Sequence, residues 1–264
     1  MTIPTLALSS VVIALTLCYA SILDIRERRV PFKTWYPMLG IAVPMLIATY
    51  IILLSDGMNP SFLAGIIILS TILCACYYVA AAYLHLFGGA DAWALIFVTA
   101  CVPLYPVEPI FGYPLLAYFP LSVLLNAVLL NLFTPFAIFG MNLRRGNRAP
   151  LRYMLVGFPV EGTGIENEFG FVMEDFSVTG DGSISRRYLS FGEAIRRMLK
   201  GERRLYTRDF KRHPEEYREE MELYRRAGKV WISYGVPFIV PICAGFISAA
   251  IFGDILSIVM TALL

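Results

Sequence analysis

The chain has 264 residues, of which 58% are hydrophobic and only 16% are charged, and its mean hydropathy is +0.66. A water-soluble domain of this size needs more charge to cover its surface. The composition therefore excludes an ordinary soluble protein and indicates a membrane protein.

Apolar stretches long enough to cross a bilayer recur along the chain, and a span needs roughly 20 apolar residues for a ~30 Å hydrocarbon core. They lie at Pro4–Leu23, Trp35–Leu54, Phe62–Leu86, Trp93–Val107 and Tyr113–Phe139, with a last one after Trp231. Their hydrophobicity is continuous rather than alternating, which favours helices over barrel strands. The sequence predicts an all-α polytopic membrane bundle of about six transmembrane helices.

The distribution of cations orients this bundle. All 22 Lys and Arg residues lie in Arg26–Lys33 or Arg144–Lys229. If the first helix runs from outside to inside, the same six-helix scheme delivers both clusters to the cytoplasm, as the positive-inside rule requires. The sequence thus predicts a multi-pass protein of the cell membrane whose soluble part is cytoplasmic.

Residues 141–230 differ in composition from the rest of the chain, being rich in Arg, Glu and Gly. Phe158–Ile165 and Glu168–Val178 are predicted to form short strands, and Ser190–Lys229 charged helices. We expect a small α+β cytoplasmic domain between helices five and six, with residues 1–140 and 231–264 forming the membrane domain. Its basic helices either face anionic headgroups or form a solvated surface.

Metal and cofactor sites are not expected. The five cysteines lie in predicted spans without a CxxC pair, and the chain has two histidines. This pattern does not suit zinc, and small apolar packing residues are the simpler interpretation. No nucleic-acid partner is expected either, and the oligomeric state is left open.

Two aspartates stand at predicted helix ends on the cytoplasmic side. Asp24 ends the first span, and Asp91 opens the fourth two residues after Gly89, where Gly88 and Gly89 allow a tight backbone turn. Ionisable groups at membrane depth are expensive and tend to mark function. Two facing carboxyls can share a proton, so that one activates water while the other protonates the attacked carbonyl oxygen.

Structural interpretations of both aspartates remain open. Asp24 could pair with Arg26 or Arg28 at a helix end, and Asp91 could be a first-turn carboxylate favoured by the helix dipole. If the aspartates are catalytic, Arg26, Arg28 and His85 are candidates for tuning their pKa or orienting them. Asp254, in the last apolar stretch, is a weaker candidate for a second carboxylate site.

The aspartates lie in motifs that resemble those of the type IV prepilin peptidase family, which are GxGD-type membrane aspartic proteases. Asp24–Pro31 resembles the first catalytic motif and Gly88–Asp91 the second. Trp231–Ile239 resembles the last span of the archaeal branch, the preflagellin peptidases. The bacterial members carry Gly where this chain has Ala90.

The resemblance implies an aspartic endopeptidase with Asp24 and Asp91 as the catalytic pair. It would remove the short basic leader of flagellin or pilin-like precursors at the cytoplasmic face, within the lipid bilayer and without a cofactor. The paired CxxC motifs of the bifunctional bacterial enzymes are missing, so methyltransferase activity is not expected. A proton- or cation-coupled transporter and a non-catalytic filament-assembly scaffold remain the alternatives.

Overall fold

The computed structural model describes residues 4–84, 88–114, 116–180, 183–189, 192–193, 196, 205–234 and 238–263. The chain forms two compact units. The membrane unit comprises Met1–Leu132 and Pro237–Leu264, and the small unit comprises Phe133–Val236.

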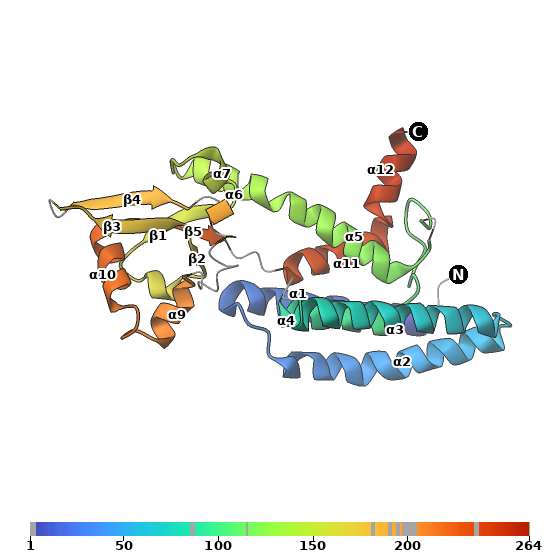
Figure 1. The fold of residues 1–264 in the computed structure, drawn as a ribbon. Helices are drawn as coiled ribbons and strands as arrows, with labels where there is room; N and C mark the ends of the chain where they lie inside the picture. Colours follow the sequence, from blue (N-terminus) through green and yellow to red (C-terminus); the bar gives the residue numbers. More distant parts are fainter. Residues whose placement is uncertain are drawn as a thin grey trace. The chain divides into compact units, whose positions relative to one another are not determined.

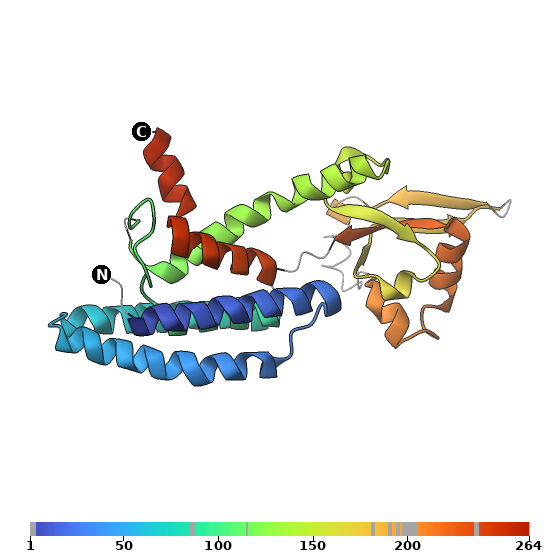
Figure 2. The ribbon, with the colours of Figure 1, turned by 180° about the vertical axis from the view of Figure 1, so that it is seen from behind.

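The membrane unit is helical. Its elements are α1 (Pro4–Glu27), the 3-10 helix η1 (Phe32–Trp35), α2 (Tyr36–Ser55), α3 (Pro60–Ala82), α4 (Gly89–Cys101), α5 (Phe119–Leu132), α11 (Ile239–Phe252) and α12 (Ile255–Leu263). Helix α1 packs against both α2 and α11, α3 packs against α4, and α5 packs against α11 (Figures 1 and 2). Their buried side chains form one continuous hydrophobic core.

Four helical stretches are long and apolar enough to cross a membrane: Pro4–Glu27, Phe32–Ser55, Pro60–Ala82 and Phe119–Arg144. A fifth is obtained if α11 and α12, which are bent by 54° relative to each other, count as one span. The many exposed apolar side chains on these helices suit contact with lipid. The described structure is thus that of a multi-pass membrane protein, with a span count of four or five from helix length alone.

Helix α4 is shorter than the span predicted at Trp93–Val107. It ends at Cys101, and the chain then runs without a regular helix until Phe119. Pro103 and Pro106 explain the early end, because proline has no N–H to donate and disfavours helical geometry in the residue before it. The helix predicted to start at Tyr113 begins only at Phe119.

A buried amide holds the break between α11 and α12. Asn126 on α5 is fully buried; its Nδ2 donates to the Gly253 carbonyl (2.9 Å) and to Ser248 Oγ (3.1 Å), and its Oδ1 accepts from the Ile255 N–H (3.0 Å). Gly253 has a φ of 92° and a ψ of −154°, a conformation that is essentially restricted to glycine. The bend is therefore specified by side chains, and Figure 2 shows α12 turning away from α11.

Helices α5 and α11 touch backbone to backbone. A Cβ atom on Gly245 would come within 2.7 Å of the Val123 carbonyl oxygen and of the Ala127 nitrogen. Only glycine allows this approach, so Gly245 fixes how closely the two helices pack.

The small unit contains two antiparallel sheets flanked by short helices (Figure 1). One sheet has the order β1-β5-β2 and the other pairs β3 with β4. The strands are β1 (Gly157–Glu161), β2 (Gly170–Val172), β3 (Glu174–Val178), β4 (Ile184–Tyr188) and β5 (Lys229–Tyr234). The helices are α6 (Thr134–Arg144), α7 (Leu151–Met154), η2 (Ile165–Asn167), α9 (Thr207–Arg212) and α10 (Arg218–Ala227).

Strand β5 corrects one prediction. Trp231 and its neighbours, expected to start the last transmembrane helix, form the central strand, with Trp231 opposite Pro159 and Ile232 opposite Val172. Helix α11 begins later, at Ile239. The run is apolar because a central strand has neighbours on both edges and buries its side chains: Val230 and Ile232 are fully buried in the core of the small unit.

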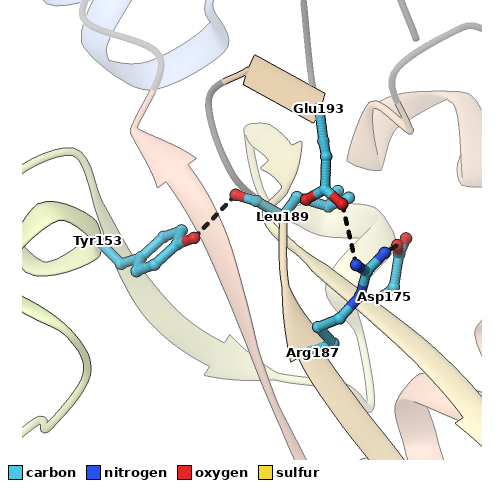
Figure 3. Close-up of polar contacts among 5 residues, drawn as sticks. All are labelled: Tyr153, Asp175, Arg187, Leu189 and Glu193. Atoms are coloured by element: carbon cyan, nitrogen blue, oxygen red, sulfur yellow. Dashed lines mark hydrogen bonds and ion pairs between the residues drawn. The ribbon is translucent and has the colours of Figure 1, made fainter. Parts of the chain in front are cut away.

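Ion pairs and a buried carboxyl fasten the β3–β4 hairpin. Arg187 contacts Asp175 (3.3 Å) and Glu193 (2.9 Å), and the Tyr153 hydroxyl donates to the Leu189 carbonyl (2.9 Å) (Figure 3). Glu174 is only 2% exposed, and its Oε2 accepts from the Trp231 N–H at 2.8 Å. Two of the five acidic residues between Glu161 and Asp175 thus have structural partners.

Candidate active site

Asp24 lies in the last turn of α1 and is half-buried. Three residues earlier, Ser21 faces the core of the membrane unit, and its hydroxyl donates to the Ile239 carbonyl of α11 at 3.5 Å. Three residues before Ser21 on the same helix, the sulfur atom of Cys18 lies 3.5 Å from that of Cys243 on α11. The end of α1 that carries Asp24 is therefore packed along the first turns of α11.

Asp91 lies in the first turn of α4, where the helix dipole favours a negative charge. Its Oδ2 accepts a hydrogen bond from the Gly88 N–H at 3.1 Å. Gly88 has an ordinary extended backbone, which any residue can adopt, so its φ and ψ angles do not require glycine. The constraint is space: a Cβ atom there would stand 2.9 Å from Asp91 Oδ2, whereas one on Gly89 would meet nothing within 4 Å.

The membrane unit brings the two aspartates together. Helix α4 contacts both α1 and α11, and the carboxyls of Asp24 and Asp91 are close enough for their charges to interact. In the sequence the two residues are separated by two complete helices, and only the predicted topology and the motifs indicated that they form a pair.

An aromatic cluster fixes the chain that follows α1 against α4. The Phe32 ring lies 5.0 Å from Trp93, and Trp93 stacks on Phe97 at 5.4 Å. Trp35 is almost completely buried and lies 5.5 Å from Phe97. These contacts begin two residues after Asp91, so they hold the first turn of α4 in place relative to η1.

The backbone of Ile239 is a third component that sequence reasoning missed. Its N–H, in the first turn of α11, interacts with the Asp91 carboxylate, while its carbonyl accepts from Ser21. The backbone N–H and carbonyl of this one buried residue of α11 thus contact α4 and α1, respectively. A backbone amide 148 positions beyond Asp91 leaves no motif in the sequence from which it could have been found.

Of the basic residues proposed as helpers, Arg28 is the one that interacts with Asp24. Its guanidinium is close enough for electrostatic attraction to the Asp24 carboxylate, and its N–H caps the end of α1 on the Asp24 carbonyl (3.0 Å). Arg28 has a φ of 52°, a left-handed conformation that is unfavourable for a residue with a side chain. Arg26 is exposed, and His85 lies outside the described residues.

Asp254 has a structural role. Its Oδ1 accepts from the N–H groups of Leu256 (2.9 Å) and Ser257 (3.4 Å), and its Oδ2 accepts from the Ser257 hydroxyl (3.2 Å). These are the bonds of a helix N-cap at the start of α12. They account for both oxygens of this carboxylate.

Comparison with known families matches both parts of the chain. Residues 11–137, which include Asp24 and Asp91, match the type IV leader peptidase family. Residues 149–255 match the domain described as archaeal peptidase A24 C-terminus, type II. The chain belongs to the type IV leader peptidase family.

A relative of this leader peptidase is the preflagellin peptidase of Methanococcus voltae, with 26% identity over 258 residues, covering 93% of the chain and 96% of the relative. The likeness therefore runs through the membrane unit and the small unit alike. A leader peptidase is a protease that processes precursor proteins, and the type IV leader peptidase described here has several apolar helices suited to a membrane.

Proposed function

We propose that the chain is an aspartic endopeptidase in which Asp24 and Asp91 form the catalytic pair. The supporting observation is that Asp24, in the last turn of α1, and Asp91, in the first turn of α4, lie within electrostatic range of each other, and that Asp91 also interacts with the first turn of α11. Their separation into different helices lets the pair adjust when a peptide binds.

The reaction follows from one shared proton. The ionised aspartate takes a proton from a water molecule as the water oxygen attacks the scissile carbonyl carbon, and the protonated aspartate gives its proton to the carbonyl oxygen. Collapse of the tetrahedral intermediate breaks the C–N bond, and the leaving nitrogen receives a proton from the carboxyl that accepted one from water. A hydroxyl of the intermediate returns a proton to the other carboxyl, which restores the shared proton. No step of this reaction needs a metal or cofactor.

The substrates in this proposal are preflagellins or type IV pilin-like precursors, which carry a short basic leader. The family match and the preflagellin peptidase relative support this class. The catalytic side is the cytoplasmic one, because both clusters of cations then lie inside. This orientation needs the predicted six crossings, with α4 as the fourth and the bent pair α11–α12 as the sixth.

The short α4 is the weakest of these crossings by length. Its 13 residues extend ~20 Å, less than a ~30 Å hydrocarbon core. Buried residues continue from its end, since Val102 and Tyr105 belong to the core of the membrane unit. Non-helical backbone at membrane depth is tolerated where protein covers it.

The decisive experiment is cleavage of a purified preflagellin by the detergent-solubilised protein, with products identified by mass spectrometry. We expect Asp24→Asn and Asp91→Asn each to abolish removal of the leader. Asp254→Asn is the matched control: it changes a carboxylate of the same unit that only caps α12, and it should retain activity. Full activity of either Asp24→Asn or Asp91→Asn would refute the catalytic pair.

A further inference from the structure

Four arginines form an exposed basic surface at the start of the small unit. Arg144, Arg145, Arg148 and Arg152, here called the arginine platform, are all exposed. None of the four forms an ion pair with a described residue, in contrast to Arg187, which is held between two carboxylates. No Asp or Glu occurs between Ile110 and Val160. The platform therefore carries charge that its own sequence neighbours do not neutralise.

A buried asparagine gives the platform a defined shape. Asn142, near the end of α6, is fully buried and its Nδ2 donates to the carbonyls of Met154 (2.9 Å) and Gly157 (2.7 Å). Its Oδ1 accepts from Asn147 Nδ2 at 2.9 Å. Gly146, with a φ of 69°, turns the chain after α6. These bonds tie the loop and α7 back to α6, so the backbone that carries the arginines has a defined course.

Apolar side chains are interleaved with the arginines. Leu143 is 58% exposed, Leu151 is 62% exposed and Val156 is 45% exposed. The opposite side of this segment is buried, with Tyr153 and Met154 in the core of the small unit. Exposed leucine and valine beside unpaired cations suit the headgroup region of a bilayer, where apolar groups enter the lipid and cations meet phosphates.

The position of the platform in the chain points to the same partner. The apolar stretch Phe119–Arg144, which is long enough to cross a membrane, ends at the first arginine of the platform. Residues that directly follow a span lie at the membrane boundary, within the few ångströms over which an anionic surface attracts cations. Guanidinium groups also match phosphate oxygens in geometry, because they donate two parallel hydrogen bonds.

We propose that the arginine platform is a binding surface for the phosphate headgroups of anionic phospholipids in the leaflet where the Phe119–Arg144 span ends. This surface holds the start of the small unit at the membrane. It is separate from the aspartate pair, and it does not depend on the reaction that the pair performs.

Native mass spectrometry of the full-length protein in detergent tests this directly. The protein is titrated with phosphatidylglycerol or with phosphatidylcholine, and the number of bound lipids is counted. The wild type should bind phosphatidylglycerol preferentially. A variant with Arg144→Gln, Arg145→Gln, Arg148→Gln and Arg152→Gln should lower that preference about tenfold. The two double variants, R144Q/R145Q and R148Q/R152Q, should each show part of the loss.

The control removes the same charge from another surface of the small unit. Lys211, Arg212, Arg218 and Arg225 are exposed on or beside α9 and α10, and their combined change to Gln should leave the preference unchanged. Equal losses in the platform and control variants would overturn the proposal, since binding would then follow net charge. Unchanged lipid binding with lost precursor cleavage would also overturn it and assign the platform to a protein partner.

Discussion

The N–H of Gly88 donates a hydrogen bond to Oδ2 of Asp91 at 3.1 Å, and the same carboxylate oxygen occupies the space that a side chain on Gly88 would need. The glycine thus bears on the position of the aspartate through both its donor and its lack of a Cβ.

Gly88→Ala should therefore impair activity more than stability. The added methyl group would press on Asp91 Oδ2 at 2.9 Å, and the carboxylate can swing away at little cost to folding. We expect kcat/KM for preflagellin cleavage to fall by ~10- to 100-fold, as small misplacements of reacting groups do, with a change in unfolding free energy of under ~0.5 kcal/mol.

Gly89→Ala is the control for that change. The site is open, and alanine is favourable in a helical first turn, so activity should stay within about twofold of wild type and stability should rise slightly. Equal activity losses in the two alanine variants would contradict the steric explanation.

Ser21→Ala tests the contact between α1 and α11. The Ser21 hydroxyl donates to the Ile239 carbonyl, and the N–H of the same residue interacts with Asp91. Removing the hydroxyl should therefore loosen the site. We expect kcat to fall about two- to tenfold, with KM nearly unchanged and a destabilisation of ~1 kcal/mol.

The comparison for this variant is Ser10→Ala, another buried serine on α1. Its hydroxyl donates at 2.8 Å to Leu6 of the same helix and touches no part of the site. A similar loss of stability with normal kcat is expected. If Ser10→Ala slowed cleavage as much as Ser21→Ala, general loosening of α1 would explain both.

The membrane bundle could largely be predicted from the sequence, because unbroken apolar stretches and clustered cations are one-dimensional signals. The ends of elements could not. Pro103 and Pro106 indicate that α4 ends early, but the apolar residues around them favoured a longer helix. Val230-Trp231-Ile232 is too short a run to distinguish a buried strand from the start of a span, and β5 pairs with residues 60 to 76 positions away.

The motifs in the sequence single out the two aspartates as candidates, but they do not predict the residues that surround them. Asp24 and Asp91 each stand beside glycines or arginines that mark them. Ile239 contributes only backbone groups, so its side chain carries no information about that contact. Likewise Glu174 is buried in the small unit, although it lies in a segment of the sequence that is rich in acidic residues.

Asn126→Leu should destabilise the membrane unit strongly. The change leaves the buried Gly253 carbonyl and Ile255 N–H without their partner, which costs roughly 2–4 kcal/mol for two such groups. Thermal unfolding in detergent measures the loss. Asn59→Ala, which removes one exposed cap from α3, should cost only ~1 kcal/mol or less. Equal effects of the two changes would argue against a buried clasp at the α11–α12 break.

The stability of the small unit should depend on pH through Glu174. Burial raises the pKa of this carboxyl, and the nearby Arg186 guanidinium opposes the rise only in part. The protonated form therefore favours folding, so this contribution is full at pH values below the ordinary pKa of glutamate and is lost as the pH rises through the folded-state pKa.

Glu174→Gln removes that dependence and keeps an oxygen that accepts from the Trp231 N–H. Hydrogen exchange of the β5 amides, compared between variant and wild type at each pH, measures the effect. The variant should gain protection relative to wild type as the pH increases from 5 to 8, because only the wild type loses stability when Glu174 ionises. A constant difference across this range would show that Glu174 does not titrate there.

The close contact at Gly245 has a consequence for how the enzyme moves. Two helices whose backbones touch cannot slide past each other without collision, so α5 and α11 must travel as a single rigid body. The first turn of α11 faces Asp91, so this rigid body forms one fixed side of the candidate site. Any approach of the two aspartates during turnover must then come from α1 or α4, and a probe attached to either helix would report the motion that a probe on α5 would miss.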